Sequence, residues 1–264
     1  MDKFDIIILA GQSNAEGSGV GAVENEFQPT EKILSLSAEK TVEHLPENLK
    51  IVYADKPFSI DIAKERVCEG KTTADFALPF ARLYAQELLA EDRKILIVRA
   101  AVGGSGFYKK HWTMEGILYN KMLEMVDYAL SLHPENRVTA LLWHQGEHDA
   151  FEKNAPECFK AQLKGLVESV RVRYHCPNMP FIAGDFVNEW KMENIGDCTP
   201  IVEKIQEVVK EVGNGAFVET ADLPSNNQAV QNGDNIHFCR ASLYELGARY
   251  FQAYKSTSLT LDAV

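Results

Sequence analysis

The sequence predicts an α/β fold in three layers, with a doubly wound, mostly parallel sheet between two layers of helices. Two observations lead to this prediction. Short apolar segments alternate along the chain with amphipathic ones, and the apolar segments have few polar positions on either face. Strands that are apolar on both faces need cover on both sides, which is typical of a parallel sheet flanked by helices.

Five apolar segments have the length and composition of strands. Each is too short for an average helix, and several are rich in isoleucine and valine. These segments are residues 5–10, 94–101, 138–143, 180–186 and 215–221.

Four segments have the pattern of helices. Apolar residues recur at helical spacing over residues 77–88 and 201–212. Thr199 followed by Pro200 predicts where the second of these helices begins, because threonine is a good N-cap and proline suits the first helical position. Two further helices are predicted over residues 155–174 and 240–255.

The whole chain, residues 1–264, is predicted to form one domain. No internal repeat or low-complexity linker divides it, and 264 residues is an ordinary size for a single α/β domain. Residues 18–73 have weak periodicity and many polar side chains, so we expect a loop-rich insertion there.

Composition and charge argue against several classes of partner. The net charge of −11 argues against nucleic acid, since affinity for phosphate backbones depends on basic patches. No segment has the ~18 consecutive apolar residues of a membrane span, and the N-terminal apolar run is shorter than that of a signal peptide. The five cysteines are scattered without a C-x-x-C pair. We therefore expect a cytoplasmic protein with free thiols and no membrane partner, and we leave open whether it is a homo-oligomer.

Polar residues follow the apolar segments, at the edge where a parallel sheet binds its ligands. The first segment is followed by Gln12, Ser13 and Asn14, and the second by residues 103–105. Residues 144–149 follow the third segment, and another polar cluster precedes the C-terminal helix at residues 233–238. We expect these four clusters to meet at one edge of the sheet.

The residue types in these clusters suit nucleophilic catalysis by a serine. Such a serine needs a base, an acid that orients the base, and hydrogen-bond donors for the oxyanion. Ser13 would project from the sheet edge, and the D-x-x-H spacing of Asp234 and His237 can place a carboxylate beside an imidazole. The backbone amides of Ser13 and Gly104 and the side chain of Gln145 are candidate oxyanion donors.

Other interpretations compete with this one. A serine after a strand is commonly a helix cap, and D-x-x-H is commonly a loop hydrogen bond. The segment H-Q-G-E-H matches a zinc-peptidase pattern that would use His144, Glu147 and His148. That pattern needs both histidines on one helix face, but here it follows a strand and contains a glycine, so we expect no metal site. A catalytically idle carbohydrate-binding protein is a further alternative.

Four motifs together resemble the SGNH hydrolases, and in particular the branch of acetyl xylan esterases and sialate O-acetylesterases. The motifs are GQSN at 11–14, GGS at 103–105, WHQGEHD at 143–149 and DNIHF at 234–238. The resemblance implies a flavodoxin-like arrangement of the sheet. It also implies a carboxylic ester hydrolase that needs no metal or organic cofactor.

The resemblance assigns roles to individual residues. It makes Ser13 the nucleophile, His237 the base and Asp234 its acidic partner, with an oxyanion hole formed by Ser13, Gly104 and Gln145. Glu147 is a rival for the acidic role, because some members of the branch use this glutamate. The implied activity removes O-acetyl groups from a carbohydrate of the xylan, oligosaccharide or sialic acid type through an acyl-enzyme intermediate.

Three residues near these motifs are candidates for substrate binding. Gln12 and Asn14 flank the nucleophile in the sequence. Trp112 belongs to an aromatic and basic stretch at 107–112 and could stack on a pyranose ring. A Trp112 that instead packs inward, beneath a solvated loop, is an equally open interpretation.

Overall fold

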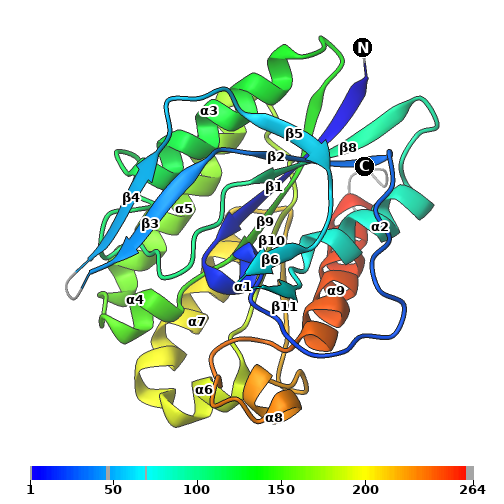
Figure 1. The fold of residues 1–264 in the computed structure, drawn as a ribbon. Coiled ribbons are helices and arrows are strands. Elements are labelled where there is room, and N and C mark those ends of the chain that lie inside the picture. The colour runs from blue at the N-terminus through cyan, green and yellow to red at the C-terminus, as the bar shows by residue number, and fades with distance from the viewer. Residues whose placement is uncertain (1, 46–47, 69, 260–264) are drawn as a thin grey trace.

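The computed structural model describes residues 2–45, 48–68 and 70–259, and a seven-stranded sheet lies at its centre (Figure 1). The strand order is β11-β10-β9-β1-β8-β2-β5. Every neighbouring pair is parallel except β2 and β5, which confirms the predicted mostly parallel sheet. In sheet order the strands are β11 (Gly215–Val218), β10 (Phe181–Gly184), β9 (Arg137–His144), β1 (Lys3–Gly11), β8 (Arg93–Arg99), β2 (Ile33–Ser37) and β5 (Ser59–Ile62).

Helices cover both faces of the sheet and complete the three layers (Figure 1). One face packs against α3 (Ile117–Ser131), α5 (Pro156–Arg173) and α7 (Ile195–Glu211). The other face packs against α2 (Ala77–Glu87) and α9 (Arg240–Leu259). Four short helices follow the ends of strands: α1 (Ser13–Glu16), α4 (Glu147–Phe151), α6 (Asn188–Glu193) and α8 (Asn226–Val230).

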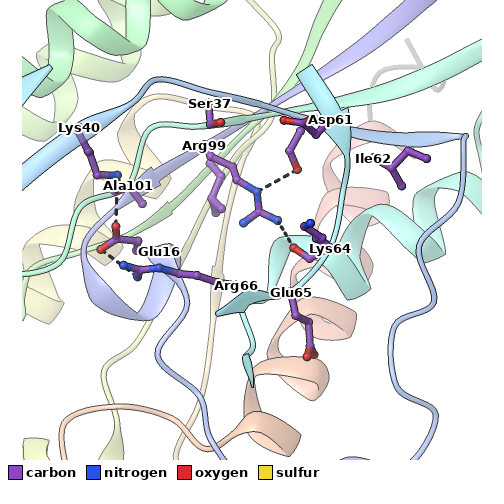
Figure 2. A pocket seen from close by; sticks show the side chains of 12 residues that line it. Glu16, Ser37, Lys40, Asp61, Ile62, Lys64, Glu65, Arg66, Arg99 and Ala101 are labelled. Carbon is purple, nitrogen blue, oxygen red and sulfur yellow. Dashed lines mark hydrogen bonds and ion pairs between the residues drawn. The ribbon is translucent and has the colours of Figure 1, made fainter. Parts of the chain in front are cut away.

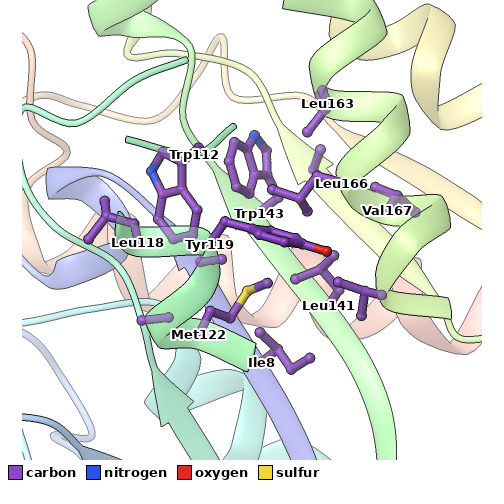
Figure 3. Close-up of a cluster of buried hydrophobic side chains, with 14 of the residues drawn as sticks. Ile8, Trp112, Leu118, Tyr119, Met122, Leu141, Trp143, Leu163, Leu166 and Val167 are labelled. Carbon is purple, nitrogen blue, oxygen red and sulfur yellow. The ribbon is translucent and has the colours of Figure 1, made fainter. Parts of the chain in front are cut away.

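The core on the α3 side is built around two tryptophans (Figure 3). Trp112 and Trp143 are fully buried, and their rings meet edge to face with centroids 5.3 Å apart. The indole nitrogen of Trp112 donates a hydrogen bond to the Ser105 hydroxyl at 2.9 Å. The loop that follows β8 is therefore anchored in the core rather than free on the surface.

The predicted start of the α7 helix is wrong. The helix begins at Ile195, so Pro200 lies inside it instead of at its first position. The backbone amide of Asn194 donates to the carbonyl groups of Trp190 and Lys191, and Asn194 in turn accepts from Cys198. Helix α6 thus runs almost directly into α7, and the chain is already helical when it reaches Pro200.

The segment 18–73 contains more regular structure than the expected loop-rich insertion. Strands β2 and β5 join the main sheet. The remaining strands form two small antiparallel pairs, β3 (Lys40–His44) with β4 (Leu49–Tyr53) and β6 (Arg66–Cys68) with β7 (Lys71–Thr73). Most side chains of β3 and β5 are at least partly exposed, so these strands lack the apolar runs that mark buried strands.

No helix within the described residues is long and apolar enough to cross a membrane. Cys158, Cys176, Cys198 and Cys239 are free thiols, as expected, while the side chain of Cys68 lies outside the described part of the chain.

Gly11, the last residue of β1, allows a test of how tightly the central strands are packed. Its φ is +137°, and a Cβ added there would lie 2.2 Å from the backbone oxygen of His144. We expect Gly11→Ala to lower the free energy of unfolding by about 3 kcal/mol, because alanine resists this backbone conformation and overlaps β9. Urea unfolding followed by circular dichroism measures the change.

The matched control is Gly196→Ala in α7, where an added Cβ meets no atom within 4 Å. Alanine is a better helix former than glycine, so this variant should be at least as stable as the wild type. Equal stability of Gly11→Ala and wild type would contradict the packing described for β1 and β9.

Candidate active site

Ser13 stands at the carboxyl end of the central strand. β1 is paired with β8 on one side and β9 on the other. The backbone amide of Gln12 continues the ladder by donating to the carbonyl oxygen of His144 at 3.0 Å. Ser13 is the next residue and begins α1, so its position is fixed by the sheet on both sides.

Ser13, His237 and Asp234 form a continuous chain of hydrogen bonds. Ser13 Oγ lies 2.8 Å from His237 Nε2, and His237 Nδ1 lies 2.9 Å from each carboxylate oxygen of Asp234. The side chains of His237 and Asp234 are 24% and 28% exposed, so solvent and a ligand can reach them. The structure thus brings Ser13 into contact with a histidine that lies more than two hundred positions later in the sequence.

The carboxylate of Asp234 is held in its ionised form. Partial burial by itself raises the pKa of Asp234. Hydrogen bonds from His237 and Asn226 lower it by more than burial raises it, so the pKa lies below its ordinary value. An ionised Asp234 accepts a hydrogen bond from the Nδ1–H group of His237. This leaves Nε2 of the neutral imidazole free to accept a proton from Ser13.

Asn14 fixes the loop that carries the histidine. Its side-chain nitrogen donates to the carbonyl oxygen of Ile236 at 3.2 Å, and its oxygen accepts from the backbone amide of Phe238 at 3.1 Å. Both neighbours of His237 are therefore tied to the residue that follows the nucleophile. The expectation that Asn14 contacts substrate is wrong, since the side chain is fully buried and its groups are used within the protein.

Glu147 supports Asn14 rather than touching the histidine ring. It is fully buried, and its Oε1 accepts from the side chain of Asn14 at 3.0 Å. Burial raises the pKa of the Glu147 carboxyl. Among the described residues its Oε2 has no hydrogen-bond partner. Of the two rival carboxylates, Asp234 is the one in direct contact with His237.

The zinc-peptidase pattern is not formed in three dimensions. His144 ends strand β9, where burial lowers its pKa to about 3 and its Nδ1 lies 3.0 Å from the Tyr250 hydroxyl. His148 belongs to α4 instead, so the two histidines do not share a helix face. In the part of the chain that the structure describes, no group of three or more His, Cys, Asp or Glu side chains could hold a metal ion.

The loop after β8 lies directly against the nucleophile. A Cβ added to Gly103 would be 3.4 Å from the Cβ of Ser13, so a side chain there would crowd the serine. Gly104 has a φ of +72°, a conformation that glycine adopts at little cost, and it lines the same cavity as Ser13. The backbone amides of Ser13 and Gly104 are thus candidate donors for an oxyanion.

Gln145 does not present a free donor to this site. Its side-chain nitrogen donates to Asp149 Oδ2 at 2.6 Å and to the carbonyl oxygen of Ser105 at 3.3 Å, so both hydrogens of the amide are engaged. The role of Gln145 as a third oxyanion donor stays a prediction, and Gln145 does not line the cavity described below. Gln145 instead links the end of β9 to the loop after β8.

A cavity of about 550 Å³ opens over Ser13 and His237. Gln12 lines it, and its Oε1 accepts a hydrogen bond from the backbone amide of His148 at 3.1 Å, while its contact with substrate stays a prediction. Trp112 does not line it, because it is fully buried in the core, so its expected role in binding sugar is wrong.

His44, Phe151 and Trp190 also line the cavity and were not predicted from the sequence, and the same holds for Glu16 and Ser18. Phe151 is 69% exposed and follows the 143–149 motif closely, so its position near the site could have been inferred from that motif. His44 reaches the cavity from β3, within the segment 18–73, where no periodicity indicated a strand.

Comparison with known families makes this chain a carboxylic ester hydrolase. Residues 3–256 match the model of the family described as carbohydrate esterase, sialic acid-specific acetylesterase, and the chain therefore belongs to this family.

The chain is also similar to individual proteins. The chain is 25% identical over 258 residues to the probable carbohydrate esterase At4g34215 of Arabidopsis thaliana, covering 95% of this chain and 90% of that protein. Its fold is similar to the crystal structure of NanS, with a TM-score of 0.73 at 20% identity and 97% of each chain covered. It is also similar to XAC1771, a carbohydrate acetylesterase from Xanthomonas citri, with a TM-score of 0.65 at 16% identity, covering 97% of this chain and 56% of that one.

Near-isosteric substitutions can distinguish the roles of the Asp234 and Glu147 carboxylates. We expect Asp234→Asn to lower kcat by about 10³-fold or more, because the amide no longer orients the imidazole or stabilises its charged form. Glu147→Gln should lower kcat by less than about tenfold, since the new amide oxygen can still accept from Asn14. Steady-state hydrolysis of an acetyl ester measures both, and the opposite ranking would make Glu147 the principal partner of His237.

Proposed function

We propose that this carbohydrate esterase removes O-acetyl groups from its substrate with Ser13 as the nucleophile. The observation that carries the proposal is the 2.8 Å contact between Ser13 Oγ and His237 Nε2, with Asp234 on the far side of the ring. This is the arrangement of a nucleophile, its general base and an orienting acid.

Acylation begins when His237 accepts the proton of Ser13 as Oγ attacks the acetyl carbonyl carbon. The negative charge that develops on the carbonyl oxygen is stabilised by the backbone amides of Ser13 and Gly104. Asp234 stabilises the imidazolium of His237. When the tetrahedral intermediate collapses, the bond to the sugar oxygen breaks, His237 gives its proton to that oxygen, and the acetyl group stays on Ser13.

Deacylation repeats these steps with water in place of the serine hydroxyl. His237 accepts a proton from the water as the water oxygen attacks the acetyl carbonyl. The same amides stabilise the second oxyanion, and His237 returns the proton to Ser13 Oγ as acetate leaves. The exposed side of His237 faces the cavity, which gives water access to the acyl-enzyme.

The cavity is suited to a sugar ring. Aromatic side chains of Phe151 and Trp190 lie on its wall, and aromatic faces pack against the apolar faces of pyranose rings. The family description favours an O-acetylated sialic acid as the substrate. Acetylated xylo-oligosaccharides form the second class to be compared.

Replacement of the nucleophile gives the most direct kinetic test. We expect Ser13→Ala to lower kcat/KM by about 10⁴-fold or more, because the variant lacks the hydroxyl that contacts His237. Acetate release should be measured on O-acetylated sialic acid, acetylated xylo-oligosaccharides and p-nitrophenyl acetate, with and without a chelator.

The matched control is Ser18→Ala. Ser18 lines the same cavity, but its hydroxyl donates to the carbonyl oxygen of Ser13 at 3.1 Å and not to the histidine. It should keep most of the wild-type activity. Turnover that survives Ser13→Ala but is lost with a chelator would refute the serine mechanism, and a wild type without turnover on any ester would favour a carbohydrate-binding role.

A further inference from the structure

Glu16 lines two cavities of the protein. One is the cavity over Ser13 and His237. The other has a volume of about 290 Å³ and is lined in large part by the segment 18–73, including Lys40 and Arg66. Glu16 belongs to the same helical turn as the nucleophile, so its charge and contacts act close to the reacting atoms.

The carboxylate of Glu16 holds the loop that contains the proposed oxyanion donor. Its Oε2 accepts a hydrogen bond from the backbone amide of Gly103 at 2.7 Å. Gly103 and Gly104 have no side chains that could restrict or anchor their backbone, so this pair of residues is conformationally flexible unless other groups fix it. A fixed acceptor on the Gly103 amide therefore orients the following peptide and the Gly104 amide.

A carboxylate at this position also carries an electrostatic cost. A negative charge in the same turn as Ser13 opposes the formation of an oxyanion there. Two cations from the segment 18–73 offset it: Lys40 Nζ lies 3.2 Å from Oε1 of Glu16, and Arg66 Nη1 lies 3.5 Å from Oε2 (Figure 2). The Glu16 side chain is 16% exposed, so solvent only partly screens these interactions.

We propose that Glu16 is a positioning residue for the oxyanion hole and that Lys40 and Arg66 neutralise its charge. The inference rests on the proposed function, since it assumes that an oxyanion forms between Ser13 and Gly104. It gives the segment 18–73 a part in catalysis. The segment supplies the two cations that neutralise the Glu16 carboxylate beside the nucleophile.

Two substitutions of Glu16 separate its hydrogen bond from its charge. Glu16→Ala removes the acceptor for Gly103, and we expect kcat on p-nitrophenyl acetate to fall by about 10- to 100-fold while KM changes by less than about threefold. Glu16→Gln keeps an oxygen acceptor, and we expect its kcat to lie within about threefold of wild type. A purely structural role would change KM and kcat together and would give no recovery with glutamine.

A second set of variants tests the role of the two cations. The double variant Lys40→Met with Arg66→Met leaves the Glu16 carboxylate uncompensated, and we expect kcat to fall by about tenfold or more. Addition of Glu16→Gln to that double variant should raise kcat again, because it removes the unpaired charge but keeps the hydrogen bond. This recovery is the result that only charge compensation predicts.

The control variant is Glu39→Ala, which removes a glutamate of the same segment whose partner is the exposed Lys56. It should match the wild type in kcat and in thermal midpoint. Should Glu16→Ala fail to fold, the triple variant at positions 16, 40 and 66 still decides the question. Wild-type kcat in Glu16→Ala, or no recovery in the triple variant, would overturn the inference while leaving the Ser13 mechanism standing. A wild type inactive on every ester would overturn the proposed function, and this inference with it.

Discussion

The whole site depends on β1 being the central strand of a parallel sheet. Because β1 is paired on both sides, its carboxyl end lies level with the ends of β8 and β9. The amide of Gln12 bonds the carbonyl of His144, and the amide of Val102 bonds the carbonyl of Gly11 at 3.2 Å. These backbone bonds set the nucleophile between the loop after β8 and the motif after β9. A slip of one residue would move Ser13 by about 3.3 Å and break the contact with His237.

The histidine reaches the site by a different route, because the sheet does not hold it. His237 lies in the loop before α9 and is fixed through Asn14, which is itself held by Glu147. Buried polar groups are costly unless they are paired, so the hydrogen bonds that Asn14 makes leave few alternative geometries for it. The network therefore gives precision to a loop that would otherwise be free to move. It also explains why a buried carboxyl can matter to catalysis without touching the ring.

Much of the fold and part of the site follow from local sequence patterns. The five apolar strands and four of the long helices were predicted because of the length, composition and spacing of their apolar residues. The contact between Asp234 and His237 was predicted because the two residues are only three positions apart. The assignments of Asn14 and Trp112 as substrate contacts were wrong because tertiary packing buries both side chains. Lys40 and His44 could not be found, since they come from β3, a short strand that is at least partly exposed along its whole length. Arg66 begins β6, which has only three residues and is too short to show an apolar pattern. The role of Glu16 could not be predicted either, because its hydrogen-bond partner is the backbone amide of Gly103, which is distant in the sequence.

The central claim is that Ser13 becomes covalently acetylated during turnover. The most direct test is to mix the wild-type enzyme with excess p-nitrophenyl acetate, stop the reaction in acid within the first turnovers, and analyse the peptides by mass spectrometry. We expect the peptide that contains Ser13 to gain the mass of one acetyl group in place of a hydrogen, with fragment ions that place the acetyl group on Ser13. Stable acetylation at another residue in step with turnover, or full turnover with no acetylated peptide under conditions where deacylation limits the rate, would contradict the account.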